Sequence, residues 1–172
     1  MRKVVDWEVN TYLIQSILDN SELDLSKALV NLVLLFNSFE SKTKWYRYIE
    51  KFDLEKIYYL EIFNYFKRRY VTDNKINEKF NGLFRDSYFS PDNLDENDNE
   101  SRNKKRVIEC LLGNNNQDKE KLATCLIIAY RFRNNIFHGK KHICELENYL
   151  GCYKVIIELF NNILIHFALQ KY

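Results

Sequence analysis

The chain has 172 residues, of which 46% are hydrophobic and 15% aromatic, so it can bury a sizeable core, and a largely disordered protein is excluded. Its formal net charge of +2 is too small to indicate a nucleic-acid or membrane partner by itself. The four cysteines show no CxxC pairing and lie in apolar runs, which is typical of small buried residues in a reducing compartment.

The predicted secondary structure is helical from end to end. Apolar residues recur at three- and four-residue spacing, and no run shows sustained alternation. Helices are predicted, in chain order, over residues 7–18, 25–39, 54–66, 77–84, 102–112, 118–137 and 146–167. We therefore expect an all-α fold: one helical bundle of about five to seven helices that forms a single domain over residues 1–172.

Residues 90–103 (SPDNLDENDNESRN) are polar and acidic, and they are predicted to form a solvated loop or insertion rather than a functional lid. No signal peptide is expected at MRKVVDWEVN, which lacks a continuous apolar stretch. The longest apolar region, 149–169, is interrupted by Lys154, Glu158 and two asparagines, so no membrane span is predicted. We expect a cytoplasmic protein.

The helix at 118–137 carries the most informative residues. Its start is predicted near Asp118, whose carboxylate can cap the first amides. Gly139 is predicted to close it, and Lys140 and Lys141 suit its negative end. An apolar arc of this helix, with Arg133 near its centre, consists of Leu122, Cys125, Leu126, Ala129, Ile136 and Phe137. The opposite side is also apolar, so the first half of the helix is predicted to be buried.

An arginine on an apolar arc needs a partner, because its guanidinium group stays charged. The structural interpretation is that Arg133 reaches the surface or pairs with Glu109 or Glu145. The functional interpretation is that Arg133 lines a phosphate-binding pocket. No acidic residue occurs between Lys121 and Cys144, which favours an anionic partner, although charge runs are more often solvated helix ends.

The stretch from Arg133 to His138, RNNIFH, resembles the motif of the HEPN superfamily (higher eukaryotes and prokaryotes nucleotide-binding). That motif is an arginine, usually a polar residue after it, and then a histidine, with four to six residues between the two. Asn134 is a typical polar follower of Arg133. Arg131 also satisfies the spacing, but Phe132 follows it, so Arg133 is the favoured motif arginine.

The resemblance implies a metal-independent endoribonuclease whose site is shared by two copies of the chain. Arg133, His138 and Asn134 would be the catalytic residues, and Arg131, Lys140 and Lys141 would bind the RNA backbone. It implies a toxin or phage-defence context and a reaction that needs no cofactor. The implied partners are RNA, a second copy of the chain in a homodimer, and a cognate antitoxin or defence-system subunit. On an ideal helix Arg133 and His138 point roughly 140° apart, and two facing helices would let them converge.

Two alternatives stay open. A HEPN-like dimer that binds RNA, nucleotides or a protein without cleaving has the same sequence pattern. A metal site at His138, His142 and Cys144 has acceptable spacing, but Gly139 is predicted to break the helix between the two histidines. His166 is predicted to be a packed histidine of the last helix.

Two aromatic-basic stretches, KWYRY (44–48) and YFKRRY (65–70), resemble surfaces on which nucleic-acid bases stack. The favoured interpretation is structural: the aromatic residues are core, and Lys67, Arg68 and Arg69 face water.

Overall fold

The computed structural model of the chain describes residues 25–42, 54, 57–84, 99–137 and 147–169. These residues form an all-α fold, as predicted, with one very small β-hairpin. The helices are α2 (Leu25–Lys42), α4 (Leu60–Tyr70), α5 (Glu78–Leu83), α6 (Asn99–Leu111), α7 (Asp118–Phe137) and α9 (Leu150–Leu169), and a short 3-10 helix, η4 (Glu147–Tyr149), precedes α9. No helix in these ranges is both long enough and apolar enough to cross a membrane.

The chain forms two compact units, one of residues 1–48 with 143–172 and one of residues 49–142. In the first unit, α2 packs along α9. Aromatic residues fill their interface: the Phe160 ring lies 4.7 Å from the Phe36 ring and 4.8 Å from the Phe39 ring, measured between centroids. The predicted apolar stripes of residues 25–39 and 146–167 therefore face each other across this helix pair.

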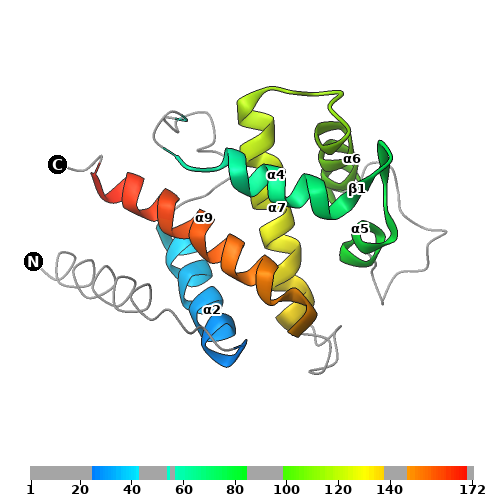
Figure 1. The fold of residues 1–172 in the computed structure, drawn as a ribbon. Helices are drawn as coiled ribbons and strands as arrows, with labels where there is room; N and C mark the ends of the chain where they lie inside the picture. The colour runs from blue at the N-terminus through cyan, green and yellow to red at the C-terminus, as the bar shows by residue number, and fades with distance from the viewer. Residues whose placement is uncertain (1–24, 43–53, 55–56, 85–98, 138–146, 170–172) are drawn as a thin grey trace, which may run out of the picture. The chain divides into compact units, whose positions relative to one another are not determined.

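The second unit is built around α7. Every residue from Leu122 to Ala129 is buried, which confirms the prediction that the first half of this helix is central. A helix that is apolar on all sides needs neighbours on all sides. Helices α4, α5 and α6 pack against α7 and supply that cover, and α4 crosses α7 (Figure 1).

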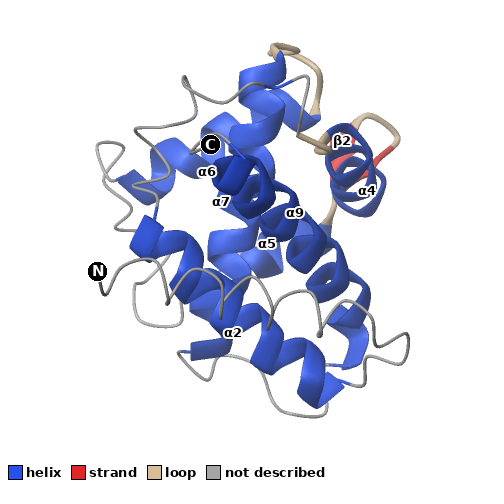
Figure 2. Cartoon of the chain, turned by 90° about the vertical axis from the view of Figure 1, so that its left-hand side faces the viewer, coloured by secondary structure: helices blue, strands red, loops and turns tan. Residues whose placement is uncertain are grey.

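A two-stranded hairpin connects α4 to α5, and it was not predicted. Strand β1 (Val71–Thr72) pairs antiparallel with β2 (Lys75–Ile76), beside α4 (Figure 2). Asp73 and Asn74 form the turn with φ angles of 52° and 57°, a left-handed conformation that these two residue types tolerate well. Strands of two residues are too short to show alternation, so only the Asp-Asn pair signals the turn.

Asn77 holds the hairpin to the end of α4. Its main-chain N–H donates to the carbonyl of Tyr70, and its side-chain amide donates to the carbonyl of Arg69, both at 2.9 Å. The last carbonyls of a helix have no partner inside the helix, so Asn77 satisfies two of them and fixes where the chain turns.

Several element boundaries differ from the prediction. Helix α4 begins at Leu60 rather than at residue 54, although the apolar pattern extends further back. Helix α6 begins at Asn99, so residues 99–103 of the predicted polar loop are helical. Only Glu100 and Arg102 of these five residues are good helix formers, so the composition of this segment does not mark the start of the helix. The predicted helix at 7–18 and Gly139 lie outside the described residues.

Candidate functional site

The predicted catalytic residues Arg133 and Asn134 lie together near the end of α7. Nη1 of Arg133 donates to Oδ1 of Asn134 at 3.2 Å, and both side chains are half-buried. The guanidinium carbon of Arg133 lies 5.7 Å from the centroid of the Tyr130 ring, within the range of a cation–π contact. The guanidinium group is thus held beside Asn134 and Tyr130 on the same helix.

Arg131, the alternative motif arginine, has different surroundings. Its guanidinium carbon lies 5.2 Å from the centroid of the ring of Phe84, the residue that follows α5. The Arg131 side chain is half-buried. Two positions on an α-helix differ by about 200°, so Arg131 and Arg133 leave α7 on nearly opposite sides. Arg133 contacts the polar residue that follows it, Asn134, whereas the residue that follows Arg131 is the buried, apolar Phe132.

Asn135 is a residue that the sequence did not single out. Its side chain is 4% exposed, and Nδ2 donates to the main-chain carbonyl of Leu83 at 3.1 Å. Leu83 is the last residue of α5, so this carbonyl has no partner inside its own helix. The only signal in the sequence was a second asparagine directly after Asn134, in a helix that is otherwise mostly apolar.

The first turn of α7 is fixed by charged contacts. Glu120 accepts two hydrogen bonds from Arg106 of α6, at 2.6 Å and 2.7 Å, and the hydrogen bonds and charge of Arg106 lower the pKa of the Glu120 carboxyl. Asp118 accepts a hydrogen bond from Lys121 at 3.0 Å. Helix α7 begins at Asp118, as predicted. The cap position is occupied by Gln117 rather than Asp118, because the Gln117 carbonyl accepts hydrogen bonds from the amides of Glu120 and Lys121.

Tyr59 connects the residues before α4 to the start of α7. The side chain is 3% exposed, and its hydroxyl group donates a hydrogen bond to the carboxylate of Asp118. Burial, followed by the negative charge of Asp118, raises the pKa of Tyr59 to about 12. This tyrosine therefore stays protonated under ordinary conditions and serves as a structural link.

The described cysteines, Cys110, Cys125 and Cys152, are buried free thiols, in agreement with the prediction. Burial raises the pKa of the Cys110 and Cys125 thiols. A buried thiol with a raised pKa is a poor nucleophile, so these two residues suit a packing role.

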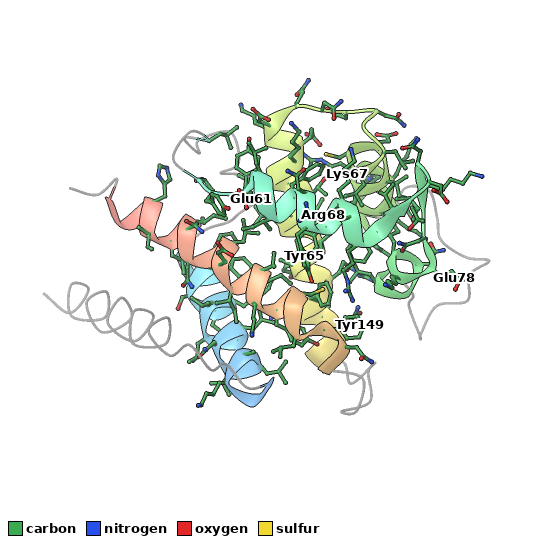
Figure 3. The ribbon with its side chains drawn as sticks, in the orientation of Figure 1. Glu61, Tyr65, Lys67, Arg68, Glu78 and Tyr149 are labelled. Atoms are coloured by element: carbon green, nitrogen blue, oxygen red, sulfur yellow. The ribbon has the colours of Figure 1, made fainter. Side chains whose placement is uncertain are left out.

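The YFKRRY stretch belongs to α4 and the interior of its unit. Phe66 and Tyr70 are fully buried, so these two aromatic side chains cannot stack on bases. Arg68 is exposed, whereas Lys67 and Arg69 are half-buried; Lys67 and Arg68 lie along α4 in Figure 3. The structural interpretation is confirmed for Phe66 and Tyr70, whereas Tyr65 is half-buried, and it holds only in part for the three cations. The other aromatic-basic stretch, 44–48, lies outside the described residues.

Other predicted site residues lie outside the described part of the chain, namely His138, Lys140, Lys141, His142 and Cys144. Within the described ranges no group of three or more histidine, cysteine, aspartate or glutamate side chains could hold a metal ion. His166 is buried near the end of α9, as expected for a packed histidine. The predicted pairing of Arg133 with Glu145 also involves a residue outside these ranges.

Comparison with known proteins gives no relative. No protein-family model matches the sequence, and neither the curated proteins nor the solved structures contain a significant match.

Proposed function

We propose that the chain is a metal-independent endoribonuclease whose site is centred on Arg133 and His138. The observation that carries the proposal is the Arg133–Asn134 pair, joined at 3.2 Å near the end of α7 and followed in the sequence by His138. The resemblance of this stretch to the HEPN motif supports the same reading. The absence of acidic residues between Lys121 and Cys144 gives the segment the charge that an RNA backbone requires.

The proposed reaction uses the substrate's own 2′-hydroxyl group. His138 takes the proton from this hydroxyl, and the 2′-oxygen forms a bond to the neighbouring phosphorus as the bond to the 5′-oxygen breaks. A protonated histidine gives a proton to the leaving oxygen. Arg133 stabilises the negative charge that develops on the phosphate, and Asn134 orients the Arg133 guanidinium group. The products are a 2′,3′-cyclic phosphate and a 5′-hydroxyl end.

A homodimer is part of the proposal. Arg133 and His138 are five positions apart, which places them roughly 140° apart on a regular helix. Two copies of the chain related by a two-fold axis bring Arg133 of one copy to His138 of the other. Lys140 and Lys141 then bind the RNA backbone on either side of the cleaved bond.

The setting that fits this activity is a cytoplasmic toxin or phage-defence nuclease. An unrestrained ribonuclease damages its own cell, so a cognate antitoxin or defence-system subunit is proposed as a further partner. This part of the proposal rests on the family resemblance alone.

The test is cleavage of labelled single-stranded RNA by the purified protein, with and without EDTA, against DNA of the same sequence. We expect cleavage of RNA only, unchanged by EDTA, and its loss in Arg133→Ala and His138→Ala. Arg106→Ala is the matched control, because it removes an arginine of α6 that contacts only the first turn of α7, at Glu120, among the contacts described above. Magnesium-dependent cleavage, or equal cleavage of DNA, would contradict the mechanism. RNA binding without cleavage would indicate a non-catalytic module instead.

A further inference from the structure

We infer that Arg131 and Asn135 position the proposed site by clamping α7 to the end of α5, and that Arg131 is not an RNA ligand. The inference rests on the proposed function for its catalytic consequence. The α5 clamp is defined here as Arg131 and Asn135 of α7 together with Leu83 and Phe84. Its two contacts are the 5.2 Å approach of Arg131 to the Phe84 ring and the 3.1 Å hydrogen bond from Asn135 to Leu83.

The two α7 residues of the clamp act on the same side of the helix. Residues four apart are neighbours on a helix surface, so Arg131 and Asn135 both reach adjacent residues at the end of α5. The Asn135 amide is buried and satisfies a carbonyl that α5 leaves without a helical partner. A buried hydrogen bond of this kind is directional, so it fixes the rotation of α7 as well as its distance from α5.

The α5 side of the clamp is itself rigidly supported. Phe84 is 6% exposed, and its ring lies 4.9 Å from that of Phe80. Phe80 in turn lies 5.7 Å from Tyr70, which stacks on Phe66 at 6.1 Å. A row of buried aromatic rings therefore connects the end of α4 to the ring that Arg131 covers.

In the sequence, Arg133 lies midway between Arg131 and Asn135, the two clamp residues of α7. A rotation of the last turns of α7 would break the Asn135 hydrogen bond and move the Arg131 guanidinium group off Phe84. The same rotation would redirect Arg133, which leaves α7 on nearly the opposite side from Arg131, and would disturb its contact with Asn134. Displacement of a catalytic group by about 1 Å can lower a rate about 100-fold, so the clamp is expected to control the catalytic rate constant.

The test compares Asn135→Leu and Phe84→Leu with Asn162→Leu as a control. Asn162 is matched because its side-chain amide also donates to a main-chain carbonyl, that of Glu158 at 2.8 Å, but within α9. Two quantities are measured on the full chain: the NMR signal of the Arg133 Nε–H group, and kcat and KM for cleavage of a mixed-sequence single-stranded RNA. Circular dichroism checks that each variant is folded, and Phe84→Leu carries the test if Asn135→Leu does not fold.

Both clamp variants are expected to shift the Arg133 signal and to lower kcat by about 100-fold with little change in KM, while the control changes neither. An unmoved Arg133 signal, or a shifted signal with normal kcat, would overturn the inference. If the wild-type chain cleaves no RNA, the proposed function fails, and the Arg133 signal alone decides whether the clamp sets the position of this arginine.

A second measurement separates clamping from RNA binding by Arg131. Arg131→Met keeps an aliphatic chain over Phe84 and removes the charge. Its affinity for 2′-O-methyl RNA, which cannot be cleaved by the proposed route, is measured at several salt concentrations. We expect the slope of log affinity against log salt to stay at the wild-type value. A slope smaller in magnitude by about one would show that Arg131 contacts a phosphate and would overturn its assignment to the clamp.

Discussion

The side-chain amide of Asn135 donates a hydrogen bond to the main-chain carbonyl of Leu83, 52 residues earlier in the chain. Both groups are buried, and the bond joins the end of α5 to the part of α7 that carries Arg133 and Asn134. A local sequence pattern cannot reveal such a contact. This hydrogen bond gives the last turns of α7 a fixed orientation within their unit.

Replacement of Asn135 by alanine is expected to destabilise the fold by about 1–3 kcal/mol, because it leaves the Leu83 carbonyl buried without its donor. Urea denaturation followed by circular dichroism measures the change. Asn162→Ala, which removes an amide from a more accessible position on α9, is expected to cost less. An equal decrease in the free energy of unfolding for the two variants would show that the Asn135 hydrogen bond stabilises the fold no more than that of Asn162 does.

The Arg106–Glu120 ion pair is expected to make stability depend on acid pH. The pKa of Glu120 is lowered in the fold, so the folded state binds fewer protons than the unfolded state as pH falls. The stabilisation is therefore present above the unfolded pKa of about 4.3 and is lost as pH falls through the folded pKa. Because the Arg106 side chain is 43% exposed, the coupling energy is expected to be only about 0.5–1 kcal/mol.

A double-mutant cycle of Arg106→Gln and Glu120→Gln measures this energy from urea denaturation at neutral pH and at pH values below the folded pKa of Glu120. The coupling should be present at neutral pH and absent under acid conditions. A coupling that does not change with pH would contradict the assignment.

The fold class and the buried half of α7 could be predicted from sequence because they follow from the spacing of apolar residues. Residues Leu122 to Ala129 are apolar on every side apart from Thr124, and such a segment has to be central. The start of α6 could not be predicted, since residues 99–103 are polar and look like the loop before them. The turn at Asp73 and Asn74 depends on the left-handed backbone conformation of these two residues, and no other feature of the sequence signals it.

Of the contacts around the candidate site residues, only those between neighbours in the sequence are open to prediction. Arg133 and Asn134 are adjacent in the sequence, and the structure shows them in contact. The contacts of Arg131 with Phe84 and of Asn135 with Leu83 join distant segments, and nothing in the spacing of charges indicates them. The predicted roles of His138, Lys140 and Lys141 stay predictions.

Tyr59 is expected to make the protein less stable in alkali. Its pKa is raised to about 12 in the fold, whereas an unfolded tyrosine ionises near pH 10. The stabilisation is complete below the unfolded value and is lost as pH rises towards 12, because only the unfolded state releases the proton over that range. Denaturation midpoints of wild-type protein and Tyr59→Phe, measured across this range, should converge. Parallel curves would show that Tyr59 ionises equally in both states.

The proposed composite site requires a homodimer. Light scattering after size-exclusion chromatography should give twice the chain mass of 20.9 kDa. Arg133→Ala and His138→Ala should each be inactive, and a mixture of the two should regain activity through heterodimers that combine one intact arginine with one intact histidine. A monomer, or a mixture that stays inactive despite subunit exchange, would contradict the shared site.

The central claim is that Arg133 and His138 direct the substrate's own 2′-hydroxyl group against its phosphate. The most direct test is cleavage, in EDTA, of an RNA that carries a single 2′-deoxy substitution at a mapped cut site, with mass analysis of the product ends. The account predicts that this cut alone disappears, because its nucleophile is missing, and that the other cuts leave 2′,3′-cyclic phosphates. Continued cleavage at the substituted position, or products with 5′-phosphate ends, would contradict it.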